Sequence, residues 1–380
     1  MRHLCRIICL LSILVSPFAA AEESEVTPQA IESAITKGVD FLLADQNEDG
    51  SWGSPRQTKG LNIYAPVPGS HHAFRTAVTA MAVSAIIESG RADSSGPVAE
   101  ALERGIQNLY KELPQVRRAN ADAIYNIWTH AYGLQTLALL YERSDSPAEK
   151  IKIRNLIQGQ INRLNRFESI DGGWGYYDFV AQTAKPSGSS ISFTTATVLV
   201  AFKEVESIES IELSERIVKR AIAAINRQRK SDLSYMYGEY LKSRPMYGIN
   251  RPGGSLGRSQ ACNYALKIWG DTTIREADIE DWLDKLDKRN GWLDIGRKRP
   301  VPHESWFAVA GYFYYYGHYY AAKCTELLPD GTASPFKEML AGLMLKHQEK
   351  DGSWWDFPFY SYHQPYGTAF ALMTLSRCRP

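Results

Sequence analysis

An acidic Gly-Trp block recurs along the chain at intervals that indicate a repeat architecture. The three clear copies are QNEDGSWG from Gln46, ESIDGGWG from Glu168 and QEKDGSWW from Gln348. Their tryptophans, Trp52, Trp174 and Trp354, are separated by 122 and 180 residues, which are two and three steps of about 60. A fixed period of this length is typical of stacked supersecondary units, so the sequence predicts about six repeats of about 60 residues.

The copies of the block that the 60-residue period predicts between the clear ones have lost part of the block sequence. Tyr235 or Tyr237, in SDLSYMYG, lies 61 or 63 residues after Trp174, and it marks one missing step. Trp292, in KRNGWLD, lies 62 residues before Trp354 and marks another. The step expected near residue 113 is reduced to KELPQV. With these steps included, six units cover nearly the whole mature chain.

Each unit is predicted to form two helices. The first is amphipathic, as in AIESAITKGVDFLLADQ, and Asp-Gly ends it because glycine accepts the left-handed conformation found at helix C-termini. The second has small or apolar residues around most of its circumference and should be buried. The second helices are expected at RTAVTAMAVSAII from Arg75, THAYGLQTLALL from Thr129, FTTATVLVAF from Phe193, QACNYALKIW from Gln260, SWFAVAGYFYYYG from Ser305 and YGTAFALMTL from Tyr366. The pattern predicts a ring of buried helices inside an outer ring, with no strands.

The composition limits the classes of molecule that the protein is expected to bind. The chain has 43 basic and 42 acidic residues, a net charge of +1, so nucleic acid is not an expected partner. Hydrophobic residues make up 44% of the chain, which is enough for a substantial core. Nine Trp, 21 Tyr and 13 Phe favour packed aromatic walls or an apolar pocket over a polar binding face.

The N-terminal segment MRHLCRIICLLSILVSPFAAAEES is predicted to be a secretory signal peptide. Arg2 and Arg6 precede an apolar stretch over 7–15. Ala19 and Ala21 then form a small-x-small cleavage site. Cleavage after Ala21 would give an exported protein, periplasmic or extracellular.

The predicted mature chain is a single domain over 22–380, preceded by the signal peptide at 1–21. No later stretch is uniformly apolar for the roughly 20 residues that a membrane span requires. Its three cysteines are Cys262, Cys324 and Cys378. They imply no disulfide framework, and one pair plus a free thiol remains an alternative.

The segment KGVDFLLADQNEDGSWG resembles the QW repeat of the squalene cyclase and protein prenyltransferase superfamily. The pattern has a basic residue, a small residue, an aromatic-aliphatic pair, a Gln and Gly-x-Trp, matched by Lys37, Gly38, Phe41, Leu42, Gln46, Gly50 and Trp52. Gln348, Gly352 and Trp354 repeat its core, whereas the middle copy has Glu168 in place of Gln. The resemblance covers about residues 26–379. It implies an all-α fold, a terpenoid cyclase-like α/α toroid of about six helical hairpins around a central cavity.

The same resemblance implies that the Gly-Trp blocks are structural. Function is then expected at the opposite ends of the hairpins, where the N-termini of the inner helices converge. Partial positive charge collects there because the first backbone N–H groups of each helix lack intrahelical partners, and this favours an anion.

Squalene-type cyclases protonate an alkene with an Asp from a DxDD-Thr-Ala motif. The most similar segment here, 190–196, keeps Thr195 and Ala196 but has no carboxylate. A hydroxyl is too weak an acid to protonate a carbon-carbon double bond. DIED at Asp278 belongs to DIEDWLDKLDKR and is expected on a solvated helix face. The familiar cyclase chemistry is therefore not predicted.

Protein prenyltransferases hold Zn²⁺ with an Asp, a Cys and a His. Cys262 matches the Cys, but Gln260 stands at the Asp position and Gly367 at the His position, and His363 lies four residues before the latter. We therefore expect no metal and no cofactor, and a structural role for Cys262 in the core. Arg258 resembles the diphosphate-binding Arg of this family at a shorter spacing.

The candidate ligand-binding residues are side chains, mostly polar, at or just before the start of the inner helices. They are His71, His72 and Arg75; Trp128 and His130; Arg258, Gln260 and Tyr264; His303, Glu304 and Trp306; and His363, Gln364 and Tyr366. A single His in this position would be a capping or packing residue. Several at one pole indicate a ligand site, because imidazole suits proton transfer near neutral pH.

Two long loops, 55–70 and 241–258, are expected to cover this pole. The second carries Lys242, Arg244, Arg251 and Arg258, which either attract an anionic head group or belong to a solvated Gly-Pro loop. The aromatic run at 311–320 is expected in the core, with some of its tyrosines lining the cavity.

Three hypotheses about function remain open at this point. The first is an exported toroid that binds a small apolar or amphipathic ligand, of isoprenoid type, in an aromatic central cavity. The second is a polysaccharide lyase or hydrolase, which requires a wide polar groove. The third is a non-catalytic scaffold with a protein partner. Whether the protein is an enzyme is left undecided by the sequence.

Overall fold

The computed structural model describes residues 26–59, 69–92, 95–178, 185–187, 190–303 and 308–380. The predicted signal peptide, residues 1–21, lies outside this part of the chain, as does much of the predicted loop at 55–70. No helix in the described ranges has both the length and the apolar character that crossing a bilayer requires.

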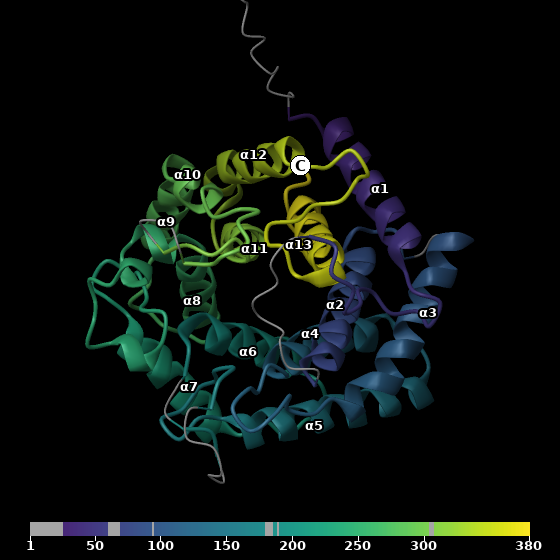
Figure 1. Cartoon of the computed structure of the whole chain (residues 1–380), viewed down its shortest axis with the longest axis horizontal. Helices are drawn as coiled ribbons and strands as arrows, with labels where there is room; N and C mark the ends of the chain where they lie inside the picture. The colour runs from purple at the N-terminus through teal and green to yellow at the C-terminus, as the bar shows by residue number, and fades with distance from the viewer. Residues whose placement is uncertain (1–25, 60–68, 93–94, 179–184, 188–189, 304–307) are drawn as a thin grey trace, which may run out of the picture.

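Six helices form a closed inner ring (Figure 1). They are α2 (Ser70–Glu88), α4 (Ile127–Arg143), α6 (Ser192–Val205), α8 (Leu256–Ile268), α11 (Phe313–Thr325) and α13 (His363–Arg377). Each contacts the next, and α13 contacts α2, which closes the ring. Every residue of α11 is buried, as expected for a helix enclosed on all sides.

Six further helices surround this ring. They are α1 (Pro28–Asp45), α3 (Pro97–Glu112), α5 (Pro147–Phe167), α7 (Glu215–Gln228), α9 (Glu276–Lys288) and α12 (Asp330–Lys346). Helices α3, α5, α7, α9 and α12 pack on the inner helix that precedes them, and α1 packs on α13, so the first and last helices of the described chain form the sixth pair. The α/α toroid of six helix pairs predicted from the sequence is confirmed.

The remaining helical segments are short. They are α10 (Asn290–Asp294) and 3₁₀ turns at Leu113–Gln115, Glu239–Leu241, Gly248–Asn250, Gly253–Ser255 and Tyr360–Tyr362. In the described chain the only β-type pairings are isolated bridges. The first of these turns directly follows α3, and the other four precede α8 or α13, at the N-terminal pole of the inner ring.

The Gly-Trp blocks share one hydrogen-bonding pattern. In each, the buried indole N–H donates to the carbonyl ten residues earlier on the outer helix: Trp52 to Leu42 (2.7 Å), Trp174 to Leu164 (2.8 Å) and Trp354 to Met344 (2.8 Å). The backbone N–H of the same tryptophan donates to a threonine hydroxyl of an inner helix: Thr79 (3.1 Å), Thr195 (2.9 Å) and Thr368 (3.0 Å). Each block therefore joins an outer helix to the inner helix that follows it in the chain.

The glutamines of the blocks join neighbouring outer helices. Gln46 Nε2 donates to the carbonyl of Ala101 on α3 (2.8 Å), and Gln348 Nε2 donates to that of Ala34 on α1 (2.9 Å). Glu168 preserves the link with reversed polarity, because its carboxylate accepts from Arg220 Nε on α7 at 2.6 Å. The change from Gln to Glu in the middle block is thus matched by an arginine on the neighbouring helix.

The structure resolves which tyrosine marks the first eroded step. The Ser234 hydroxyl and backbone N–H donate to Asp232, as those of Ser51 donate to Asp49, so Tyr235 occupies the tryptophan position. The glycine position between them is filled by Leu233, whose φ of +58° lies in the left-handed region that ordinarily selects glycine.

Two expectations about the fifth unit were wrong in position. Trp292 lies within α10, because the chain continues as helix through Asn290 and Gly291 instead of turning back at a left-handed glycine. The inner helix expected from Ser305 begins at Phe313. Residues 305–307 lie outside the described ranges, and residues 308–312 are not helical.

A glycine pair tests the contact that closes the ring. Gly352 has φ +87°, and a Cβ added there would lie 2.4 Å from the Lys37 carbonyl of α1, whereas Gly270 has φ +86° and an open surrounding. Both Ala substitutions should lower the free energy of unfolding by about 1–2 kcal/mol through the left-handed conformation. Gly352→Ala should cost about 1–3 kcal/mol more, because α1 must move. Equal losses in urea unfolding would contradict this role of the α1 contact.

Candidate ligand-binding cavity

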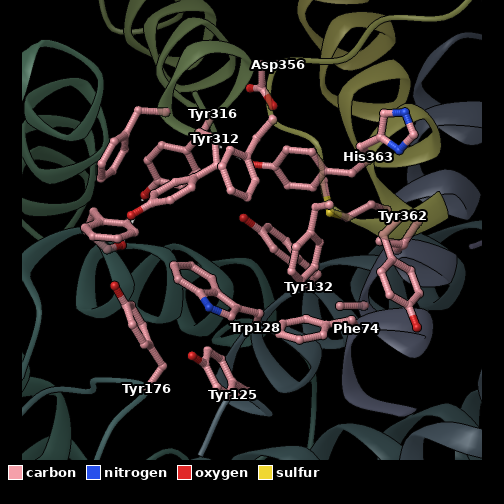
Figure 2. A pocket seen from close by; sticks show the side chains of 18 residues that line it. Phe74, Tyr125, Trp128, Tyr132, Tyr176, Tyr312, Tyr316, Asp356, Tyr362 and His363 are labelled. Carbon is pink, nitrogen blue, oxygen red and sulfur yellow. Dashed lines mark hydrogen bonds between the residues drawn. The ribbon is translucent and has the colours of Figure 1, made fainter. Parts of the chain in front are cut away.

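A cavity of about 160 Å³ lies inside the inner ring, at the N-terminal ends of its helices. Its wall consists mainly of aromatic side chains (Figure 2). The lining residues are Phe74, Ala77, Val78, Met81, Tyr125, Trp128, Tyr132, Tyr176, Phe193, Tyr312, Phe313, Tyr316, Asp356, Phe357, Phe359, Tyr362, His363 and Tyr366. Most are contributed by α2, α4, α11, α13 and the loop that precedes α13, and α6 adds Phe193.

Two phenol groups of the wall donate hydrogen bonds to backbone carbonyls. Tyr316 donates to the Phe193 carbonyl (3.1 Å), and Tyr366 donates to the Tyr312 carbonyl (3.1 Å). Burial raises the pKa of both phenols well above the ordinary value, so they remain neutral. Because these two hydroxyl groups already have partners, Tyr316 and Tyr366 offer the cavity mainly their ring faces.

Trp128 and Phe193 stack at the centre of this wall. Their ring centroids are 5.6 Å apart at an angle of 28°. Phe193 also meets Phe313 edge to face at 4.9 Å, which links α4, α6 and α11 through aromatic contacts alone. Such contacts hold the wall rigid and place no charge in it.

Asp356 is the one carboxylate among the described lining residues. Its Oδ2 accepts the backbone N–H of Tyr315 in the first turn of α11 at 3.0 Å, and its buried Oδ1 has no hydrogen-bond partner in the described chain. Burial raises the pKa of this carboxyl group to about 7. Figure 2 shows Asp356 at the edge of the ring cluster, across the cavity from Trp128.

His303 contacts the wall through Tyr312. Its Nδ1 lies 2.6 Å from the Ala308 carbonyl and must donate to it, so in the neutral ring Nε2 accepts from the Tyr312 hydroxyl at 3.1 Å. Burial lowers the pKa of His303, which keeps the ring neutral near pH 7. The pair gives Tyr312 a fixed hydroxyl orientation.

His363 lines the cavity directly. Its Nδ1 bonds to the Tyr360 carbonyl, and Nε2 is buried without a partner in the described residues. Burial lowers the pKa of His363 to about 4, so it too is neutral at physiological pH. His71 lies just behind the wall, with Nδ1 at 3.2 Å from the Tyr362 hydroxyl.

Other predicted residues face the outer helices. His72 contacts Glu112 on α3 at 3.0 Å, and Arg75 lies 3.8 Å from Asp49. His130 is fully buried against Gln160 of α5, with Nδ1 and Oε1 2.7 Å apart. None of these three lines the cavity.

The predicted group at the start of α8 has structural partners. Arg258 is fully buried and donates to the carbonyls of Tyr235 (2.9 Å), Gly254 (2.8 Å) and Ile249, which ties the preceding loop to the ring. Burial lowers the pKa of its guanidinium to about 10. Gln260 donates to the Trp282 carbonyl of α9 at 2.9 Å. Tyr264 does not line the cavity, and its ring centroid lies 5.5 Å from Lys323 Nζ of α11.

The structure thus brings together part of the predicted set. Trp128, His363 and Tyr366 line the cavity, and His71 and His303 support lining residues. Gln364 turns away to Asp351 and Ser353. Glu304 and Trp306 lie outside the described residues.

The part of the wall that comes from loops was not predicted from the sequence. Tyr125, Tyr176, Phe357 and Phe359 lie between helices. A signal was present, because aromatic residues crowd GWGYYD and SWWDFPFYSY directly after two Gly-Trp blocks. Those blocks anchor the loops, so the residues that follow them are carried onto the same pole as the inner-helix N-termini.

The described residues do not gather three or more potential metal ligands of the His, Cys, Asp or Glu type. Cys262, Cys324 and Cys378 are all buried free thiols. Burial raises the pKa of Cys262 to about 12, so its thiolate is strongly disfavoured.

No protein-family model matches the chain. Among solved structures, it is similar to a type II terpene cyclase from Scytonema, with 15% identity, a TM-score of 0.52, and 93% of this chain and 99% of that chain covered. It is also similar to an alpha-amylase from Clostridium perfringens (12%, TM-score 0.58, 91% and 97% covered) and to an alpha-1,6-mannanase from Salegentibacter (9%, TM-score 0.56, 92% and 98% covered). These similarities establish the toroid fold.

Asp356 should make stability depend on pH. Its folded-state pKa of about 7 exceeds the ordinary value of 3.8, so the folded protein binds this proton more tightly than the unfolded chain. The resulting stabilisation is complete below pH 4 and is lost as pH rises to 7, by about 1.4 kcal/mol per unit. Relative to wild type, Asp356→Asn should flatten this decline in urea unfolding. Identical slopes would disprove the assignment.

Proposed function

We propose that this is an exported protein that binds an elongated apolar or amphipathic molecule, of isoprenoid type, in its aromatic cavity. The observation that carries the proposal is a wall built mainly of aromatic rings, in which the phenol groups of Tyr316 and Tyr366 donate hydrogen bonds to backbone carbonyls. A sugar would leave many hydroxyl groups unpaired against such a wall, each costing about 1–3 kcal/mol. A hydrocarbon gives up no hydrogen bonds when it leaves water for the cavity.

The size of the cavity limits how much of a ligand it encloses. Its volume of about 160 Å³ is close to that of an engineered cavity of about 150 Å³ that holds benzene. One ring or a short branched segment therefore fits inside, and the remainder of an elongated ligand would extend to the mouth. Burying about 150 Å² of its apolar surface would contribute about 4 kcal/mol.

The isoprenoid class is supported by two similarities. One is the QW-like repeats, and the other is the shared fold with the terpene cyclase. Aromatic faces also attract unsaturated or cationic hydrocarbon centres through their quadrupoles. The proposal concerns binding, because the carboxyl group of Asp356 lies at the edge of the ring cluster and no other carboxylate is among the described lining residues.

A polysaccharide-active enzyme is the second candidate. It is favoured by the similar folds of the mannanase and the amylase. Glycoside hydrolysis generally uses two carboxyl groups that flank the scissile bond. The described cavity wall supplies Asp356 alone, which is why we place this candidate second.

Two phenylalanines test the binding proposal. Phe74 lines the cavity, whereas Phe336 packs on the core from the outer helix α12, and both are partly buried. Phe74→Ala should weaken the binding of farnesol, a neutral isoprenoid alcohol, about ten-fold through lost apolar contact. Phe336→Ala should leave the affinity unchanged. Tryptophan fluorescence titration measures both.

The same preparation separates the two candidates. Organic extraction of the purified protein followed by mass spectrometry should recover a hydrocarbon-rich molecule. Failure to bind farnesol, together with release of sugars from α-mannan or starch, would replace the first candidate with the second.

Export is tested separately, since deletion of residues 1–21 should retain the protein in the cytoplasm of the producing cell.

A further inference from the structure

A second cavity, of about 240 Å³, lies on the C-terminal side of the aromatic cavity. It is bordered mainly by the second halves of the inner helices α2, α4, α6, α11 and α13. Met81 and Tyr132 line both this cavity and the aromatic one. These two residues therefore lie at the boundary between the two cavities.

The lining residues of α2 show that the cavities lie end to end along the axis of the ring. Phe74, Val78 and Met81 line the aromatic cavity, and Met81, Ser84 and Glu88 line the second one. These positions are three or four residues apart, so they share one face of the helix. At a rise of about 1.5 Å per residue, each cavity spans about 10 Å of α2, with Met81 in the middle.

The two cavities differ in chemical character. The aromatic cavity has Asp356 as the one carboxylate among its described lining residues, whereas the second cavity is bordered by Glu88, Glu204 and Lys323 among others. The Nζ of Lys323 lies 2.9 Å from Glu204 Oε1. Covering charged groups with hydrocarbon is costly, so an apolar chain is not expected to extend into the second cavity.

Aromatic contacts hold Tyr132 in place at this boundary. Its ring stacks on Trp128, with centroids 6.3 Å apart at an angle of 16°, and meets Phe370 edge to face at 5.9 Å. Phe370 packs in turn against Tyr319 at 5.1 Å. Figure 2 shows Tyr132 near the centre of the lining side chains. The ring of Tyr132 therefore cannot turn aside without displacing other rings of the inner helices.

Met81 is the deformable part of the boundary. It is 2% exposed and is held by packing, because a thioether is only a weak hydrogen-bond acceptor. Methionine is unbranched and has rotatable bonds along its whole length, so its shape adapts while its volume still excludes other atoms. The depth of the aromatic cavity on the α2 side is therefore set by the size of this one side chain.

We propose that Met81 is the floor of the aromatic cavity and selects for short acyclic isoprenoid chains. This inference rests on the proposed isoprenoid function and adds which residue limits the ligand. In the wild type a short chain fills the space above Met81, and the additional units of a longer chain remain at the mouth. These outer units make little apolar contact, so the affinity stops rising with chain length.

Geraniol, farnesol and geranylgeraniol are matched probes, because each is longer than the one before by one isoprene unit and all end in the same hydroxyl group. The measured quantity is the affinity for geranylgeraniol relative to that for geraniol, from tryptophan fluorescence titration of the full mature chain. In the wild type this ratio should be at most about three, because the outer units bury little surface.

Three buried methionines locate the floor. Met81 borders both cavities, Met373 borders the second one alone, and Met344 on α12 borders neither, and they are 2%, 3% and 0% exposed. Met81→Ala should raise the affinity ratio about ten-fold, because the vacated space lets the chain bury about 60 Å² more of its surface. Met373→Ala and Met344→Ala remove the same side chain at similar burial and should leave the ratio at the wild-type value.

Two further substitutions at Met81 control for effects on stability. Met81→Leu keeps the side-chain volume nearly constant and should keep the wild-type ratio. Met81→Val removes less of the side chain than Met81→Ala does, and it should raise the ratio by a smaller factor.

An affinity ratio in Met81→Ala equal to that in Met344→Ala would overturn the role of Met81 and leave the proposed function intact, since the alcohols would still bind. An increase in Met373→Ala as large as that in Met81→Ala would also overturn it, because the chain would then reach the second cavity. If none of the three alcohols binds the wild type, the proposed isoprenoid function fails, and the inference about Met81 fails with it.

Discussion

The hydrogen bond from the indole of each Gly-Trp block, Trp52, Trp174 and Trp354, to the outer-helix carbonyl ten residues earlier is the interaction on which the ring depends. It fixes how the chain leaves the outer helix, and the same tryptophan's backbone N–H then reaches an inner-helix threonine. The loops that follow two of these tryptophans carry Tyr176, Asp356 and Phe357 into the cavity wall. A structural repeat thereby positions the site, although no residue of the Gly-Trp blocks lines the cavity.

The fold was predictable because its determinants are local and periodic. The 60-residue spacing, the Asp-Gly helix ends and the apolar inner helices all follow from residue type and order. The repeats with a degraded Gly-Trp block were harder to predict, because a different residue type can occupy the same position with the same backbone geometry. Leu233 accepts a left-handed conformation and Tyr235 replaces a tryptophan, whereas Gly291 continues a helix where a turn was expected.

The site was only partly predictable, because helix position alone does not fix the direction of a side chain. His71 and His72 are neighbours in sequence, yet they diverge by about 100° around the helix, so one supports the cavity wall and the other meets Glu112. Arg258 carries a charge that suggested a ligand contact, but backbone carbonyls surround it. The loop aromatics Tyr176, Phe357 and Phe359 follow Gly-Trp blocks in the sequence, but their place in the wall depends on contacts between residues distant in sequence.

The contact between α1 and α13 means that the ring is closed by helices from the two ends of the described chain. Helix α1 receives its hydrogen bond from Gln348 and its close contact from Gly352, both more than 300 residues away. During synthesis, the apolar face of α1 therefore remains uncovered until α13, close to the C-terminus, has been made. Non-local closure of this kind slows folding, so the ring closes only after α12 and α13 have been synthesised.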